Sequence, residues 1–162
     1  MIYEPNFDKY ERLTESEAFL KHGIVAETDG SGVLYRRDGE TEVFILHSTE
    51  ANAYACEIDN AYVFKGQGFG ESPYEALIRA VMDCDGYDVL DENPNMEDAM
   101  NILCYGTFEA LYGDLNESRL REVQDDGCFT SDIIGMLWTC AAEFVKEHCE
   151  DYGFEFDMSW AE

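Results

Sequence analysis

The side chains in this sequence that could do chemistry are mostly carboxylates, and they are clustered. Five acids fall within residues 83–92. Carboxylate oxygens bind Ca²⁺, and the segment fits the third, fifth, sixth and twelfth places of an EF-hand loop with Asp83, Asp85, Gly86 and Glu92. The first place would be Val81, which has no side-chain oxygen. The pattern therefore favours a helix end that runs into an acidic loop over a calcium site.

A second group of acids has the spacing of one helix face. Glu143, Glu147 and Glu150 follow one another at intervals of four and three residues, and Asp151 is adjacent. Acids four positions apart lie about 6 Å apart along a helix axis, which resembles the separation of successive phosphates in a nucleic-acid strand. Like charges at this spacing destabilise a helix slightly. The row is either an ordinary solvated face or an imitation of phosphates.

The other reactive side chains form no recognisable catalytic or metal site. The three histidines, His22, His47 and His148, stand in unrelated contexts, and the six cysteines include no CxxC pair. In a reducing compartment such cysteines are expected to be small buried hydrophobes. The glycine-rich segment 66–70 matches neither the Walker nor the dinucleotide-binding pattern, so we expect a tight turn between a strand and a helix. We predict no catalytic residue, no metal and no cofactor, and therefore no enzyme.

The acidic clusters belong to a chain that is acidic throughout. There are 36 Asp and Glu against 10 Lys and Arg, a formal net charge of −26 in 162 residues. Solubility needs a magnitude of only about 2–8. Residues 1–82 contribute −8, whereas residues 83–162, with 21 acids against 3 bases, contribute −18. Direct binding to nucleic acid or to an anionic membrane is disfavoured, so we predict a basic protein as the partner.

Composition indicates one compact acidic domain over residues 1–162. The chain is 46% hydrophobic and 14% aromatic, which is too rich for a disordered acidic tail. Its N-terminus lacks the basic start and apolar run of a signal peptide. No stretch approaches the roughly 20 apolar residues of a membrane span. We therefore expect a cytosolic protein.

The first 70 residues predict a mainly β structure. A capping box of Thr14 and Glu17, with Gly23 as the stop, predicts a short helix over 15–22. The strand patterns that follow flank two turn signals and predict an antiparallel meander of about four strands. These strands are expected at 32–37 and 41–46 around Asp38-Gly39, and at 53–58 and 61–65 around Asp59-Asn60, with a further candidate at 24–26.

Residues 71–162 predict mainly helices. Ser72, Pro73 and Glu75 mark a helix start, and Gly86 is expected just past the end of that helix. Strands followed by helices predict the α+β class, with the helices of the second half packed on one face of the sheet. The other helices are expected from Asn95, burying Met96, Ala99, Met100, Leu103 and Cys104, around 108–112, around 117–123, and from 131 to 152 with Gly153 as the stop.

One segment and the composition resemble known proteins. Residues 68–80, Gly-Phe-Gly-Glu-Ser-Pro-Tyr-Glu-Ala-Leu-Ile-Arg-Ala, resemble the strand–loop–helix of small phage proteins. In composition the whole chain is similar to phage- and plasmid-encoded DNA mimics, a group that includes antirestriction and some anti-CRISPR proteins. This resemblance implies an inhibitor, in the host cytosol, of a CRISPR effector or restriction enzyme. Two alternatives stay open: an acidic phage regulatory or adaptor module that binds a basic protein without mimicry, and adaptation to high salt.

The candidate partner-binding residues are the acids of the second half. Exposed Tyr or Phe side chains among them are expected to add apolar anchors, because aromatic residues dominate binding hot spots. Homodimer formation would enlarge such a surface and stays open. The predicted partner-binding residues are Asp83, Asp85, Asp88, Asp91, Glu92, Glu97, Asp98, Asp125, Asp126, Glu143, Glu147, Glu150 and Asp151.

Overall fold

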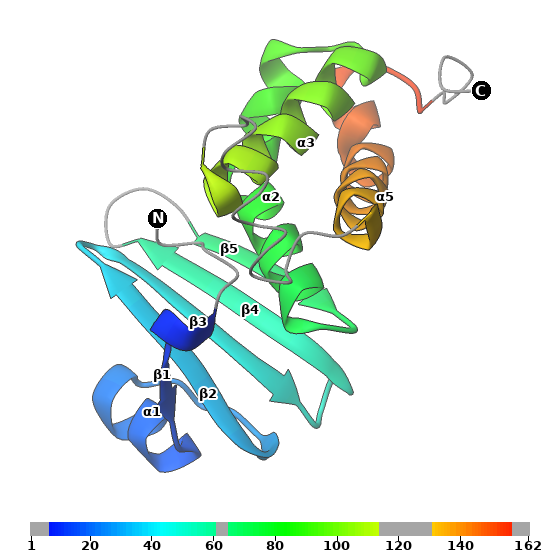
Figure 1. The fold of residues 1–162 in the computed structure, drawn as a ribbon. Coiled ribbons are helices and arrows are strands. Elements are labelled where there is room, and N and C mark those ends of the chain that lie inside the picture. The colour runs from blue at the N-terminus through cyan, green and yellow to red at the C-terminus, as the bar shows by residue number, and fades with distance from the viewer. Residues whose placement is uncertain (1–6, 61–64, 114–130, 157–162) are drawn as a thin grey trace. The chain divides into compact units, whose positions relative to one another are not determined.

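The computed structural model describes residues 7–60, 65–113 and 131–156 (Figure 1). The chain divides into two compact units, which we call the sheet unit (Ile2–Cys84) and the helical unit (Asp85–Glu162). A five-stranded antiparallel sheet forms the centre of the first unit, and helices make up the described part of the second. The predicted α+β class is confirmed, with five strands where about four were expected.

The sheet is a meander in which strands that follow one another in the sequence are neighbours. The predicted hairpin at Asp38-Gly39 is present, and Gly39 has the positive φ of 59° that its tight turn requires. No strand forms at 24–26, because Ile24 and Ala26 pack against the core from the connection that precedes the second strand. The strands are β1 (Glu11–Leu13), β2 (Thr28–Asp38), β3 (Thr41–Ser48), β4 (Ala53–Asn60) and β5 (Lys65–Gly70).

The glycine-rich segment is the fifth strand, so the predicted turn at 66–70 is wrong. β5 pairs with β4 along its whole length, from Lys65 opposite Asp59 to Gly70 opposite Tyr54. Asp59 and Asn60, expected in a turn, are the last residues of β4. Apart from Lys65, the strand predicted at 61–65 lies outside the described residues.

Glycines in β5 let a helix backbone lie directly on the strand. A Cβ on Gly68 would overlap the carbonyl oxygen of Ala76 and the amide nitrogen of Ala80, both in helix α2 (Pro73–Glu92). Gly66 makes an equally close approach to Ala80 and to the sulfur of Cys84. The glycine pattern therefore reflects close helix–strand packing within the sheet unit.

Helix α1 (Glu15–His22) forms as predicted. The hydroxyl of Thr14 accepts a hydrogen bond from the amide of Glu17 at 3.1 Å, and the Glu17 carboxylate accepts one from the amide of Thr14 at 3.2 Å. Gly23 ends the helix in the left-handed conformation, with a φ of 69°. Through the buried Ala18 the helix joins a core cluster that also contains Leu13, Val33, Tyr35 and Phe44.

The two helices of the sheet unit cover opposite faces of the sheet. Neighbouring side chains along a strand point to opposite faces. Phe44 belongs to the cluster under α1, whereas the adjacent Ile45 pairs with Cys56, which in turn pairs with Gly68 under α2. Figure 1 shows α1 next to β1 and β2, and the start of α2 next to β5.

Helix α2 starts where predicted but does not end at Gly86. The hydroxyl of Ser72 accepts a hydrogen bond from the amide of Glu75 at 3.2 Å, and the helix runs on to Glu92. Gly86 is buried, and a Cβ there would lie 2.5 Å from a ring carbon of Phe144. This glycine permits close packing of two helices instead of stopping one. The acidic loop predicted over 83–92 is therefore helical.

The other helices of the helical unit largely follow the prediction. Asn95 caps α3 (Met96–Tyr112), accepting a hydrogen bond from the amide of Asp98, and all five predicted core residues of this helix are buried. The short helix expected at 108–112 is the last turn of α3, and the one expected at 117–123 lies outside the described residues. Helix α5 (Ser131–His148) continues into the 3₁₀ turn η2 (Cys149–Tyr152), which ends at Gly153.

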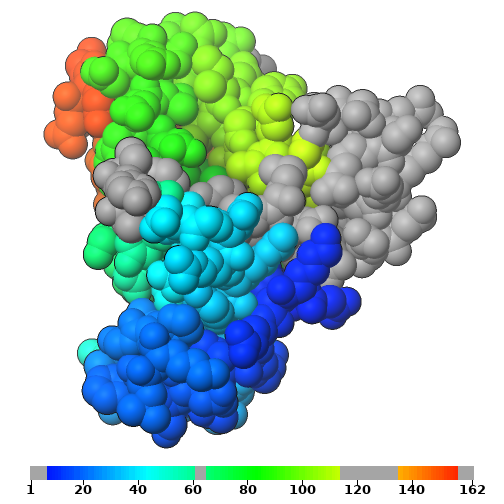
Figure 2. Space-filling model, turned by 90° about the vertical axis from the view of Figure 1, so that its left-hand side faces the viewer, coloured from blue at the N-terminus to red at the C-terminus, as the bar shows by residue number. Residues whose placement is uncertain are grey.

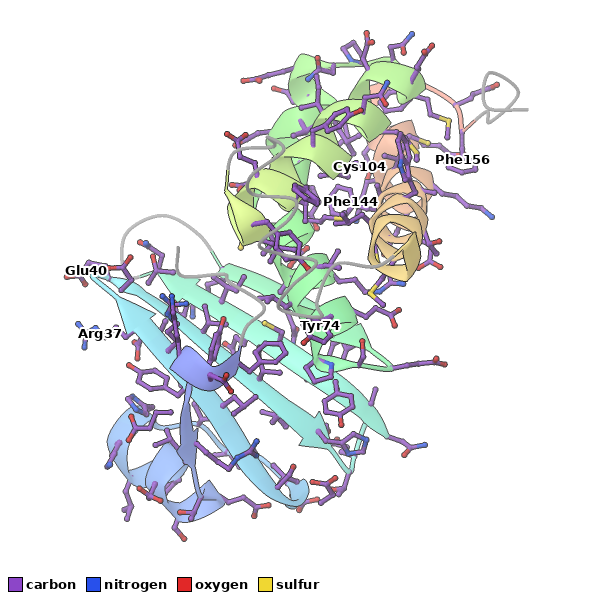
Figure 3. All side chains as sticks on the ribbon, in the orientation of Figure 1. Arg37, Glu40, Tyr74, Cys104, Phe144 and Phe156 are labelled. Carbon is purple, nitrogen blue, oxygen red and sulfur yellow. The ribbon has the colours of Figure 1, made fainter. Side chains whose placement is uncertain are left out.

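The interior of the helical unit is partly built from cysteine and aromatic side chains. Cys104 of α3 donates a weak hydrogen bond to the carbonyl of Leu137 in α5, and burial raises its pKa to about 12. Figure 3 shows Cys104 and Phe144 between the helices of this unit. Cys56, Cys140 and Cys149 are also buried free thiols. The expectation that the cysteines serve as small buried hydrophobes is confirmed for these four.

Candidate functional site

Most acids in the described part of the helical unit are exposed, and cationic side chains are scarce there. Lys146 is the single Lys or Arg within the described residues of this unit, against 13 Asp and Glu. None of the predicted acids from Asp88 to Asp98 makes an ion pair with a Lys or Arg in the part of the chain that the structure describes. We call the following exposed residues the acidic surface: Asp85, Asp88, Asp91, Glu92, Glu97, Asp98, Glu143, Glu147, Glu150 and Asp151.

Acids of the sheet unit behave differently, because several of them bind groups of their own fold. Glu15 accepts hydrogen bonds from the amide and the hydroxyl of Thr28, at 2.8 and 2.6 Å, which lower its pKa. The amide and hydroxyl of Ser31 act in the same way on Asp29. Glu75 pairs with Arg79 at 3.0 Å. These carboxylates stabilise local structure, whereas those of the acidic surface are turned to solvent.

Three of the predicted partner-binding residues do not join the acidic surface. Asp83 is half-buried in the sheet unit, where its carboxylate accepts a hydrogen bond from the amide of Gln67 in β5 at 2.9 Å. That contact ties α2 to the sheet, so Asp83 has a structural role. Asp125 and Asp126 lie outside the described residues.

A cluster of three rings brings two rows of acids together. The ring of Tyr87 in α2 lies 5.2 Å from that of Phe144 and 5.0 Å from that of His148, both in α5. Asp91 follows Tyr87 by one helical turn. Glu147 adjoins His148, with 3.8 Å between a carboxylate oxygen of Glu147 and Nε2 of His148. The acidic rows of α2 and α5 therefore lie on packed, neighbouring helices.

Crowding of like charges is visible at Asp85. Partial burial and the nearby Asp88 raise the pKa of the Asp85 carboxyl above its ordinary value of 3.8. The charged form is therefore less favourable in the folded protein than in the unfolded chain. At neutral pH this carboxylate destabilises the fold, and the penalty is relieved as the pH falls through the raised pKa.

We expect Asp85→Asn to stabilise the protein at neutral pH by about 0.5 kcal/mol, the size of one relieved like-charge pair at a solvent-screened site. The gain should shrink as the pH falls through the raised pKa of Asp85, because the carboxyl is then protonated in the native protein. Urea unfolding of both proteins at several pH values measures the difference. The control is Glu109→Gln, which changes an exposed acid on a different helix, α3, and should leave stability unchanged. A destabilised Asp85→Asn protein would contradict this interpretation.

Two apolar side chains on α3 lie exposed among acids. Tyr105 keeps 57% of its surface accessible and Ile102 keeps 44%. Asp98 precedes them and Glu109 follows them at one-turn intervals on the same helix face. Sequence reasoning expected such anchors without placing them. The signal was present in the sequence, because the predicted core residues Met100, Leu103 and Cys104 leave positions 102 and 105 on the other side of the helix.

One hollow within the described residues lies at the edge of the sheet unit. It is an open pocket of about 600 Å³ between the start of α1 and the residues 28–32 of β2, lined also by Arg12. Several of its polar groups are already engaged, since Glu15 binds Thr28 and the guanidinium of Arg12 donates to the carbonyl of Ser31. The α1 N-terminus is filled by its own capping box.

Neither a metal site nor a membrane-spanning helix is found among the described residues. Within residues 7–60, 65–113 and 131–156, no three His, Cys, Asp or Glu side chains are placed to hold a metal ion. No described helix has the length and apolar character to cross a lipid bilayer. Comparison of the chain with protein-family models, curated proteins and solved structures found no match.

Proposed function

We propose that this protein inhibits a nucleic-acid-binding defence complex of the host, a CRISPR effector or a restriction enzyme, by mimicking nucleic acid. The observation that carries the proposal is the acidic surface itself. Its carboxylates are exposed on packed helices, and those from Asp88 to Asp98 make no ion pair with Lys or Arg in the described chain. This excess of exposed negative charge is available to a cationic partner.

The mechanism is occupation of the sites that normally bind phosphates. Lys and Arg side chains of a nucleic-acid channel would pair with the carboxylates of α2, α5 and the start of α3. Opposite fields also accelerate association, and this acceleration falls as salt rises. The formal charge of −26 makes the electrostatic contribution large for a chain of this length.

Apolar contacts supplement the charges in this proposal. A phosphate backbone offers no hydrophobic side chains, whereas Ile102 and Tyr105 are exposed beside Asp98 and Glu109. Aromatic side chains are frequent hot spots in protein interfaces. A partner that presents an apolar patch bordered by Lys or Arg would bind this face of α3 more tightly than charge alone allows.

A competition experiment tests the proposal against an acidic adaptor that does not mimic nucleic acid. Purified CRISPR effectors and restriction enzymes are mixed with labelled target DNA and increasing amounts of the protein in a mobility-shift assay. We expect the apparent Kd for DNA to rise at least tenfold (about 1.4 kcal/mol) for the true target. The effect should weaken between about 50 and 300 mM NaCl as charges are screened.

The same gels separate the alternatives. A mimic and DNA exclude each other, so no complex containing both should form, and adding the protein before the DNA should inhibit most strongly. An adaptor would instead produce a slower band that contains effector, DNA and protein together. Such a band, or undiminished DNA binding with every effector tested, would overturn the proposal.

A further inference from the structure

Helix α1 exposes its large apolar side chains and buries its small one. Ala18 is fully buried against the sheet, whereas Phe19 is 56% exposed, Leu20 is 80% exposed, and Val25 in the following connection is 83% exposed. Amphipathic helices normally direct such residues to the core. Figure 2 shows the segment around α1 as a continuous blue part of the molecular surface. We call Phe19, Leu20 and Val25 the α1 patch.

The surroundings of the α1 patch differ from the acidic surface in charge. Residues 14–26 contain two acids and one lysine, together with His22. Glu15 is engaged by Thr28, while Glu17 and Lys21 form an exposed pair at 3.5 Å along the helix. Residues 14–26 thus carry a formal charge of only −1, although Glu27 follows them and Glu42 lies 3.5 Å from His22. Two acidic molecules would repel each other less if they met here than if they met at the acidic surface.

The geometry of the helix points to a second copy of this chain as the occupant. At 100° per residue, Ser16 and Leu20 project opposite Ala18, with Phe19 on one flank and Glu17 and Lys21 on the other. In an antiparallel pair related by a two-fold axis, each flank meets the same flank in reverse order. Lys21 of each copy then faces Glu17 of the other copy, which gives two equivalent contacts. The two Phe19 side chains meet on the opposite flank.

We infer that the protein forms a weak symmetric dimer through α1, centred on Leu20. The charge pattern of the helix complements itself only in this antiparallel arrangement, because a parallel two-fold pair would place the flank with Glu17 and Lys21 beside the Phe19 flank of the second copy. A basic partner, as expected for the acidic surface, gains little here since Lys21 stands at the patch. The inference is independent of the proposed function.

Added salt should strengthen this dimer, whereas it should weaken the binding of a basic partner by the acidic surface. Two molecules of net charge −26 repel each other, and salt screens that repulsion while leaving apolar burial intact. A contact of this small size corresponds to a dissociation constant on the order of 10 µM at high salt. Lower salt should weaken the dimer, whereas it should strengthen the inhibition proposed above.

Sedimentation equilibrium of the full chain at up to about 500 µM, in about 50 mM and 500 mM NaCl, measures the association. We expect Leu20→Asp to weaken the dimer at least about 30-fold at both salt concentrations, since the new charge is buried at the centre. Lys21→Glu should weaken it about tenfold at low salt and less at high salt, because it places like charges opposite each other. Circular dichroism checks that both variants keep their fold.

Ile102→Asp is the matched control, since it places the same charge on an exposed apolar residue of the helical unit. It should leave the dimer unchanged. A protein that stays monomeric throughout the concentration range would overturn the inference. So would a dimer that survives Leu20→Asp, or one that Ile102→Asp disrupts equally.

Discussion

Replacing Asp88, Asp91, Glu147 and Glu150 together by their amides is expected to weaken inhibition of the target complex about 100-fold. An exposed ion pair contributes at most about 1 kcal/mol, and a partly desolvated pair at an interface contributes more. Four lost contacts therefore amount to about 3 kcal/mol, which is about 100-fold in Kd. The four residues lie in two pairs three positions apart, Asp88 and Asp91 on α2, and Glu147 and Glu150 at the junction of α5 and η2. The dose–response of DNA-binding inhibition measures the loss.

The same variant should fold at least as well as the natural protein. Each pair of acids repels across one helical turn, so the amides relieve repulsion worth a few tenths of a kcal/mol per pair. A slightly higher midpoint of urea unfolding is expected together with the loss of inhibition. This combination separates a lost binding surface from a damaged fold, because a misfolded variant would lose both stability and inhibition.

A second fourfold variant controls for the total charge. Glu11, Glu40, Glu50 and Glu71 are exposed acids of the sheet unit, and changing them to Gln alters the net charge by the same four units. If the acidic surface makes the contacts, this control should lose only a few-fold in potency through weaker long-range attraction. Equal losses in the two variants would show that only net charge matters and would contradict a localised surface.

Charge reversal of Glu143, Glu147 and Glu150 to Lys examines the α5 row alone. A mimic should lose nearly all inhibition, since cations would face the cationic channel of the target. An adaptor that binds through another surface should change little. Lys146 already lies within this row and stacks over Phe156 at 5.8 Å, so a positive side chain is structurally tolerated there.

Local signals in the sequence predicted the elements that depend on local chemistry. The capping box of Thr14 and Glu17, the Asp38-Gly39 turn and the Asn95 cap each satisfy backbone groups within a few residues. Such interactions do not depend on contacts with residues far away in the sequence. The helices and strands next to these signals consequently appear at the predicted places.

Predictions failed where a glycine serves a distant contact. Gly86 was expected to stop a helix, but it lies inside α2 because the ring of Phe144, 58 residues further along, occupies the space of a side chain. Gly68 was expected in a turn, but it sits in β5 because the backbone of α2 approaches it. The sequence alone does not show why a glycine is needed at a position. The reason can be a backbone conformation that only glycine adopts easily, or a neighbour that leaves no room for a side chain.

The chemistry of the candidate site was predictable from the sequence, but the exact set of residues that form it was less so. Charge and helical spacing identified the exposed acids of α2, α3 and α5, since a carboxylate without a partner stays in solvent. The same signals wrongly placed Asp83 in the partner-binding surface. Its carboxylate accepts a hydrogen bond from the amide of Gln67, and this contact depends on how α2 packs on the sheet. The exposure of Ile102 and Tyr105 follows from the correctly predicted core of α3, although the sequence alone did not single out these two residues as anchors.

Gly68→Ala is expected to destabilise the sheet unit by about 3 kcal/mol, at the upper end for overpacked interiors. The added Cβ would overlap backbone atoms of Ala76 and Ala80 and lie 2.8 Å from the Cβ of Arg79. Backbone atoms of a helix cannot turn aside as a long side chain does, so α2 must move away from β5. The backbone of Gly68 is compatible with alanine, which makes the effect purely steric.

Gly106→Ala supplies the matched control in the interior of α3. A Cβ at that position meets no atom within 4 Å, and alanine favours a helix over glycine by about 1 kcal/mol. Urea unfolding followed by far-ultraviolet circular dichroism should therefore show a loss for Gly68→Ala and a gain for Gly106→Ala. If both substitutions were neutral or stabilising, α2 could not lie against the glycines of β5, and the packing that fixes the start of the acidic helix would have to be different.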